Sequence, residues 1–240
     1  MPESESVRMG RRRVSRLVTD YNNPRSLGSR LRSRRSRAVL ALLAQLHGSR
    51  GPVSVIDIGG TGYYWNSLPD QALERYDVRV TVVNLPGESH PVENPRFTFT
   101  EGDGRDLSWV GDGQFDLAIS NSVLEHVGRW AQMKAFADEV RRVADAYFVQ
   151  TPYFWFPVEP HYMTPFFHWI PEPVQARLMR RFSAAYTHSA ADWERVMRRV
   201  HSAKLVDRLT FSVLFPDATI RFEMLAGLPK SLMATRAPHA

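Results

Sequence analysis

The chain has 240 residues and a mass of 27.5 kDa, enough for one domain with a full hydrophobic core, and its lack of cysteine excludes disulfides, thiolate metal sites and a cysteine nucleophile. With 43% hydrophobic and 23% charged residues the composition is that of a globular protein, and the longest apolar run, residues 39–44, is too short to cross a membrane. The net charge of +6 comes from residues 1–50, which hold 12 arginines and three acids, whereas residues 51–240 carry −3.

The arginine-rich segment of residues 1–50 divides into two parts. Residues 1–20 show no apolar pattern and predict a frayed, solvated leader. Residues 24–50 carry leucines near helical spacing and predict one or two amphipathic helices. Clustered arginine attracts phosphate, but the chain shows no recognised nucleic-acid module, so we do not expect a nucleic-acid partner. Acids at Glu3 and Glu5 and the missing apolar leader favour a cytoplasmic protein.

From residue 53 onward, short apolar runs alternate with helical segments. Five runs predict strands, at residues 53–58, 79–84, 96–101, 115–120 and 146–151. Helical patterns lie at residues 66–76 and 129–143. This alternation predicts an α/β fold with a doubly wound, mostly parallel sheet that helices cover on both faces.

The segment that follows, residues 151–171, holds eight of the chain's 27 aromatic residues. We interpret it as an aromatic lid over a small-molecule pocket, with a core plug or a homodimer contact as the alternatives. Helices are predicted at residues 174–182 and 190–200, and strands at 204–215 and 231–236, while residues 218–228 are ambiguous. We therefore expect an arm (1–50) and one domain (51–240) with a substrate insertion at about 151–200.

A glycine turn follows the first predicted strand. Asp57 precedes Gly59, Gly60 and Gly62, and such a turn lets a ligand approach the backbone closely. Trp65 stands where a nicotinamide fingerprint needs its last glycine, and no Lys-Ser or Lys-Thr follows to make a phosphate loop. A carboxylate directly before the turn suits a ligand with an ammonium group.

Polar residues also close the next three strands. Asn84 could reach a ribose, Asp103 and Gly104 an exocyclic amine, and Asn121 and Ser122 the reacting centre. Ligands of parallel sheets bind outside the carboxyl ends of the strands, so we expect these residues to surround one cofactor.

Three stretches, VSVIDIGGTG, FTEGDGRDL and FDLAISNSVLEHV, resemble the class I S-adenosylmethionine-dependent methyltransferases over about residues 50–152. The resemblance implies a Rossmann-like fold, S-adenosyl-L-methionine as cofactor, and methyl transfer. It also implies roles for the strand-end residues: Asp57, Gly59 and Gly60 for the methionine part, Asn84 for the ribose, Asp103 with Gly104 for the adenine, and Asn121 and Ser122 near the sulfonium. The glycine loop is one residue shorter than the family pattern, and Asn84 replaces the usual acid.

Methyl transfer to a hydroxyl requires removal of a proton, and histidine has the pKa for this near neutrality. His126 and His161 are the candidates, and we favour His161 because Glu159 is close enough in sequence to orient it. We expect no metal site. Glu125, His126 and His161 echo magnesium-dependent RNA and quinol methyltransferases, but Ser122 replaces the first acid of their motif.

The sequence therefore predicts methyl transfer to a small organic acceptor, more readily at oxygen. An RNA methyltransferase that uses the basic arm on phosphates and a non-catalytic binding or scaffold protein with the same fold are the alternatives.

Overall fold

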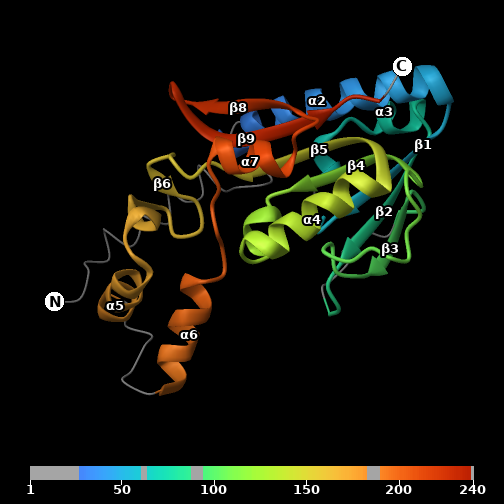
Figure 1. The fold of residues 1–240 in the computed structure, drawn as a ribbon. Helices are drawn as coiled ribbons and strands as arrows, with labels where there is room; N and C mark the ends of the chain where they lie inside the picture. Colours follow the sequence, from blue (N-terminus) through green and yellow to red (C-terminus); the bar gives the residue numbers. More distant parts are fainter. Residues whose placement is uncertain (1–26, 61–63, 88–93, 183–189, 239–240) are drawn as a thin grey trace.

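The computed structural model describes residues 27–60, 64–87, 94–182 and 190–238. Its centre is a seven-stranded sheet in the order β3-β2-β1-β4-β5-β9-β8, with helices on both faces (Figure 1). The expected doubly wound, Rossmann-like architecture is confirmed. The leader predicted at residues 1–20 lies outside the described residues. Within the described ranges, no helix is both long and apolar enough to cross a membrane.

Five strands of the sheet are parallel: β1 (Val53–Ile58), β2 (Val78–Asn84), β3 (Phe97–Glu101), β4 (Phe115–Asn121) and β5 (Ala144–Pro152). Strand β9 (Leu228–Arg236) runs antiparallel to β5, and β8 (Thr219–Leu225) runs antiparallel to β9. A second, two-stranded sheet pairs β6 (Val158–Glu159) with β7 (Thr164–Pro165). All five strands predicted up to residue 151 are found within two residues of their expected bounds.

Helices α2 (Leu27–Arg50) and α3 (Asp70–Arg75) cover one face of the sheet. In α2 the apolar positions form a buried stripe that includes Val39, Leu43 and Leu46, all 0% exposed, and this stripe packs against Phe148 of β5 and other strand residues. Burial of that stripe is what holds an otherwise arginine-rich helix on the sheet.

Helices α4 (Trp130–Val143) and α7 (Arg208–Leu214) cover the opposite face. The strand predicted at residues 204–215 is wrong, because most of this run is α7. Asp207 caps the helix by accepting a hydrogen bond from the Thr210 backbone N–H at 2.7 Å. Phe211 and Leu214, three residues apart, then face the core together. The ambiguous run 218–228 contains β8.

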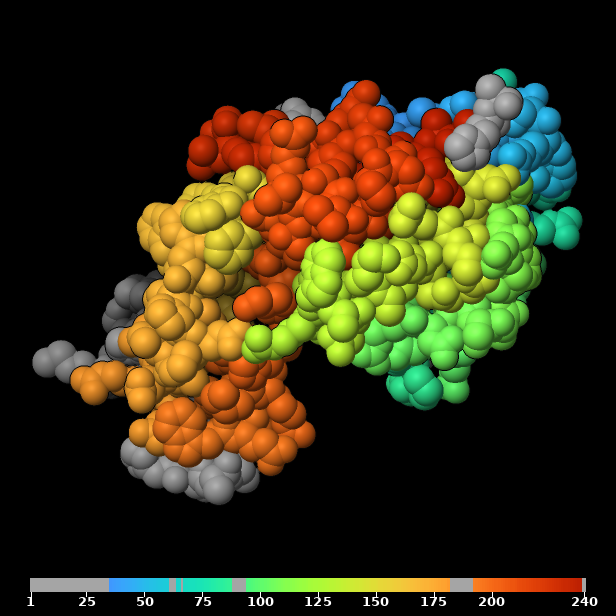
Figure 2. Space-filling view, in the orientation of Figure 1, coloured from blue at the N-terminus to red at the C-terminus, as the bar shows by residue number. Residues whose placement is uncertain are grey.

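Helices α5 (Glu172–Phe182) and α6 (Ala190–Val200) form a lobe with the β6–β7 sheet, and we call the described residues from 158 to 200 the α5–α6 lobe. It projects away from the sheet, toward the lower left in Figure 1, and the space-filling view shows it standing off from the body (Figure 2). Its helices share a small core of Ala176, Val196 and Val200, which is separate from the two cores of the sheet.

A buried arginine joins α2 to the carboxyl ends of the central strands. The Nε and Nη2 atoms of Arg35 donate to the two carboxylate oxygens of Glu223 in β8, at 2.7 and 3.1 Å. Its Nη1 atom donates to the side-chain oxygens of Asn121 and Gln150, both at 2.8 Å. Arg35 and Glu223 are 7% and 2% exposed, so their charges depend on each other for compensation.

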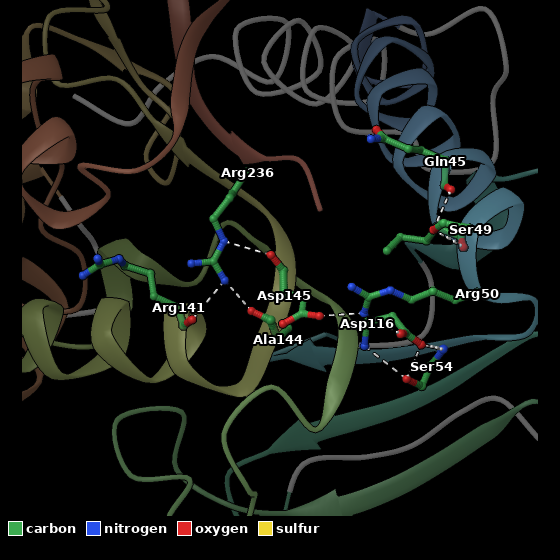
Figure 3. A network of polar contacts seen from close by, with 10 residues as sticks. Gln45, Ser49, Arg50, Ser54, Asp116, Arg141, Ala144, Asp145 and Arg236 are labelled. Carbon is green, nitrogen blue, oxygen red and sulfur yellow. Dashed lines mark hydrogen bonds and ion pairs between the residues drawn. The ribbon is translucent and has the colours of Figure 1, made fainter. Parts of the chain in front are cut away.

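The amino ends of the same strands are held by exposed or half-buried arginines (Figure 3). Arg50, the last residue of α2, donates to the carboxylates of Asp145 and Asp116 at 2.6 and 3.3 Å. Arg236 of β9 donates to the carbonyl oxygens of Asp145 and Arg141, each at 3.0 Å. Helix α2 is thus held by Arg35 at the carboxyl ends of the central strands and by Arg50 at their amino ends.

The different burial of these two arginines gives a stability prediction. Arg35→Met leaves Glu223 buried without its main partner and should lower the free energy of unfolding by about 3–5 kcal/mol. The matched variant Arg50→Met breaks an exposed pair and should cost less than about 1 kcal/mol. Urea denaturation measures both. Removal of both charges in Arg35→Met/Glu223→Met should cost less than Arg35→Met alone, and a double variant that is no more stable than the single one would contradict the pairing.

Candidate active site

A cavity of about 340 Å³ lies at the carboxyl ends of β1, β2 and β4 and is closed below by α4. Among its lining residues are Gly59, Asn84, Asp103, Gly104 and Ser122, five of the eight residues that the sequence proposed for a cofactor. Apolar side chains form another part of the wall: Ile58, Val83, Leu85, Val123, Val127 and Phe136. A mixed lining of this kind suits a small ligand that has both polar and apolar parts.

Two glycines make room for this cavity. Gly59 has a φ of +76°, and a Cβ atom built there would lie 2.6 Å from a methyl carbon of Val123. A Cβ on Gly104 would lie 2.5 Å from the Cγ2 atom of Ile58. Both positions therefore need glycine, which keeps the backbone of the two loops open to a ligand.

Asp57 lies beneath the glycine turn rather than on the cavity wall. Its side chain is 2% exposed and accepts a hydrogen bond from Nε1 of Trp65 at 2.8 Å, and a Cβ atom built on Gly60 would clash with its carboxylate. Burial raises the pKa of Asp57 to about 6, because the charged form loses its hydration. A cation bound beside this buried acid would stabilise its charged form.

Asn84 and Asp103 stand on the two sides of the cavity. The amide of Asn84 donates to the Gly60 carbonyl, so its side-chain oxygen is left as an acceptor. The carboxylate of Asp103 pairs with Arg105, and this hydrogen-bonded pair lowers the pKa of the Asp103 carboxyl. Arg105 also lines the cavity and was missed in the sequence, where it could be any exposed loop arginine.

The end of β4 turns sharply at Ser122, whose φ is +58°. Its hydroxyl donates to the side-chain oxygen of Gln150 at 3.0 Å, and its backbone N–H donates to the Gln150 carbonyl. Asn121 does not line the cavity, because its side chain points to Arg35. Arg35 too was missed, since it is one of several arginines in the amphipathic helical segment predicted at residues 24–50.

The two predicted histidines meet at the edge of the cavity. Nε2 of His126 lies 3.2 Å from Nε2 of His161, and the rings are nearly perpendicular. His126 lines the cavity, and its Nδ1 lies 2.7 Å from the carbonyl oxygen of Ser202. Nδ1 of His161 lies 2.6 Å from Oε1 of Glu159, the residue expected to orient it, and this contact raises the pKa of His161.

Glu125 completes this group from below. It is 1% exposed, and its Oε2 accepts a hydrogen bond from the Thr151 hydroxyl at 2.9 Å. Its Oε1 is buried and has no hydrogen-bond partner among the described residues. Burial raises the pKa of Glu125, and the nearby histidines oppose that change. One carboxylate oxygen and two imidazole nitrogens lie within 4.8 Å of one another.

A second cavity, of about 450 Å³, is lined by residues of the α5–α6 lobe and of the loop that precedes α7. Glu159, Phe154, Tyr162 and His168 line it, with Arg129 and Lys204 among the charged residues. The Nε2 atom of His168 lies 2.7 Å from the Phe154 carbonyl, which fixes it as the donor, so the buried Nδ1 is an acceptor without a described partner.

Comparison with known proteins gives one family and several structures. Residues 56–146 match the family model described as methyltransferase domain. No curated protein matches the sequence. Solved structures resemble the chain at low identity. An O-methyltransferase family protein from Burkholderia thailandensis is 15% identical with a TM-score of 0.49, and the match covers 95% of this chain and 64% of that one.

Two further structures are similar at the same level. Magnesium protoporphyrin IX methyltransferase from Synechocystis PCC 6803, solved with its bound methyl donor, is 15% identical with a TM-score of 0.49 over 95% of this chain and 91% of that one. The 1,6-didemethyltoxoflavin-N1-methyltransferase of Burkholderia thailandensis is 17% identical with a TM-score of 0.45 over 99% and 92%.

The buried charge of Asp57 predicts a measurable cost. Because the folded pKa, about 6, lies above the ordinary value of 3.8, the contribution of Asp57 to stability is present below about pH 4 and is lost as the pH rises through 6. Asp57→Asn keeps an acceptor for Trp65 and removes the charge. We expect it to be more stable than the wild type at pH 8, by up to about 3 kcal/mol, with no difference near pH 4. A variant that is destabilised equally at both pH values would contradict this.

Proposed function

We propose that the chain, whose residues 56–146 match a methyltransferase domain, is a class I S-adenosylmethionine-dependent methyltransferase that transfers a methyl group to a small organic acceptor, at oxygen rather than at nitrogen or carbon. The observation that carries the proposal is the place of the histidine pair. His126 lines the strand-end cavity, and the Glu159 partner of His161 lines the second cavity. The pair therefore links the two cavities, through His126 at one and through Glu159, the partner of His161, at the other.

The strand-end cavity fits the cofactor by its chemistry. When bound, S-adenosylmethionine supplies an electrophilic methyl group on a positively charged sulfur. We propose that Asp57, with Gly59 and Gly60 above it, answers the charge of the ammonium group. The free side-chain oxygen of Asn84 would accept from the ribose hydroxyls.

The adenine and sulfonium ends would be held at the other side of the cavity. There we propose Asp103 and Gly104 for the adenine, and Ser122 with Asn121 behind it for the floor near the sulfur.

The second cavity suits the acceptor. Its volume lies in the range of small-molecule sites, and Phe154 and Tyr162 offer aromatic surface. We propose that residues 151–200, expected from the sequence to be a lid, bring this cavity against the cofactor. Methyl transfer then gains most from holding the acceptor atom in line with the methyl carbon, away from water.

The histidine pair favours oxygen as the acceptor atom. A hydroxyl must lose its proton as it attacks, whereas a neutral amine attacks through its lone pair. We propose that His126 and His161 touch the acceptor oxygen and promote that loss.

We also propose that the enzyme is cytoplasmic and does not bind nucleic acid. Residues 51–240 carry a net charge of −3, which does not favour a polyanion. We also propose a homodimer contact at the exposed aromatic side chains of Trp155, Phe166 and Trp169, which are 56%, 52% and 39% exposed and pack on one another.

The role of Asp57 predicts how the cofactor binds. Calorimetric titration should give an affinity that falls at least about tenfold in Asp57→Asn, because the buried negative charge that balances the ammonium group is lost. The exposed acid Asp70 of α3 provides the matched control Asp70→Asn, which should bind as the wild type does. Near pH 6, binding should release protons, since the bound ammonium keeps Asp57 ionised. Unchanged affinity in Asp57→Asn would remove this role.

The acceptor class is tested by following the label of a methyl-labelled cofactor. We expect transfer to small hydroxylated aromatic compounds supplied as a mixture, with the label recovered as a methyl ether by mass spectrometry. Total RNA serves as the competing substrate. Label in RNA, with a steep loss at higher salt, would favour the RNA alternative, and no label in any acceptor would favour a binding protein.

A further inference from the structure

The hydrogen-bonding positions of His126 and His161 determine which of their nitrogens carry hydrogen. The Nδ1 atom of His126 faces a carbonyl oxygen, that of Ser202, which can only accept. The Nδ1 atom of His161 faces Glu159, whose other oxygen already accepts from the Tyr162 backbone N–H at 2.6 Å. Both Nδ1 atoms are therefore donors. In the neutral rings, both Nε2 atoms are left with lone pairs.

These two lone pairs face each other across 3.2 Å. Two lone pairs at this distance repel unless a positive centre lies between them, either a shared proton or a cation. Two nitrogens bound to one tetrahedral zinc ion at about 2.0–2.1 Å would be about 3.3–3.4 Å apart. The observed separation is thus close to that of two ligands of one metal ion.

Glu125 decides between the proton and the cation. A proton shared by the two nitrogens would leave Oε1 of Glu125 buried and without a partner. A cation would also give Glu125 a partner, because one oxygen of its carboxylate lies within 4.8 Å of a ring nitrogen of each histidine. The charges of Glu125 and Glu159, both at most 3% exposed, would also balance a divalent ion.

We propose that Glu125, His126 and His161 bind one divalent transition-metal ion of the zinc class, with an open coordination position that takes the acceptor oxygen. Two imidazoles and one carboxylate suit zinc, cobalt or iron, whereas magnesium and calcium prefer oxygen ligands throughout. Three protein ligands with a fourth position open is the arrangement of catalytic zinc sites. The sequence analysis expected no metal site, and this proposal differs from that expectation.

The metal site rests on the proposed function and changes the role of the histidines in it. A nitrogen bound to a metal has no lone pair for a proton, so His161 would act as a ligand instead of as the general base favoured from the sequence. The ion would lower the pKa of an acceptor hydroxyl, and solvent water would take the proton. The acceptor oxygen would then bond to the methyl carbon, while the carbon–sulfur bond breaks and its electron pair stays on the sulfur.

Glu159 and Ser202 would be positioning residues for this site. The carboxylate of Glu159 and the carbonyl of Ser202 hold the two Nδ1–H groups, and such contacts orient metal-bound imidazoles. The Lys204 backbone N–H donates to the Glu125 carbonyl at 2.6 Å and holds the loop after α6 against the ligands. A metal ion here would therefore join the turn that follows β4, the α5–α6 lobe and that loop.

The proposal is tested by metal binding to the full chain, without any substrate. After dialysis against EDTA, the chain should take up about one zinc ion per molecule, measured by elemental analysis, and cobalt should give the visible absorption of a tetrahedral site. His126→Ala and His161→Ala should each weaken zinc binding more than tenfold. The control His201→Ala removes a nearby exposed histidine and should bind as the wild type does.

Two isosteric variants separate a metal site from a structural role. Glu125→Gln should keep the bond to Thr151 and the circular dichroism of the fold, and yet lose zinc affinity. Glu159→Gln should weaken zinc about 10- to 100-fold. Glu172→Gln, at a half-buried carboxylate, is its control. Zinc uptake well below one ion per chain, or affinity equal in wild type and ligand variants, would overturn the site, and so would binding of magnesium in preference to zinc.

Failure of the site and failure of the proposed function give different results. If the metal-free chain binds S-adenosylmethionine but no zinc, the metal site is wrong and the methyltransferase proposal stands. If zinc binds and the cofactor does not, the proposed function is wrong, although the ligand set is right.

Discussion

The parallel direction of β1, β2, β4 and β5 is the constraint from which the site follows. Parallel neighbours end at the same edge of a sheet, so residues far apart in the chain arrive side by side. The register brings Asp57 level with Val82 and Ile119, and Asn121 level with Gln150. Reversal of one strand would send its polar end to the opposite edge. The apolar runs that bury both sheet faces thereby also fix where the polar residues meet.

The cost of that arrangement falls on a few buried charges. Asp57 and Glu125 are almost inaccessible to water, and neither faces a described arginine or lysine. Arg35 and Glu223 are equally buried, but they are paired with each other. Buried acids that lack a cation within the chain favour binding of one from outside. The ammonium group proposed above Asp57 and the metal ion proposed beside Glu125 have this physical reason in common.

The strands and the strand-end residues could be predicted because each depends on local sequence. An apolar run such as residues 53–58 predicts a buried strand whatever packs on it, and the glycine turn follows that strand directly. The run at residues 204–215 could not be read in this way, because its apolar residues fit either period. The Asp207 cap and the face of α4 decide for a helix.

The rest of the site depends on contacts between distant segments. Arg35 is one of 12 arginines in residues 1–50, and only the packing of α2 on the sheet shows that its side chain is buried. The sequence analysis placed His126 and His161 at one site. It could not give the distance of 3.2 Å between their Nε2 atoms. The Ser202 carbonyl that fixes one imidazole comes from backbone after α6, and no sequence pattern marks it.

The α5–α6 lobe has a core of three buried residues, whereas each face of the sheet buries many more. Local stability follows the apolar area that a unit buries, so the lobe needs less free energy to open than the sheet needs to unfold. Access to the cavities is therefore separable from the integrity of the fold. The lobe can open to admit reactants and release products while the sheet stays folded. Substitutions in the lobe helices can therefore change the proposed acceptor cavity and leave the strand-end cavity unchanged.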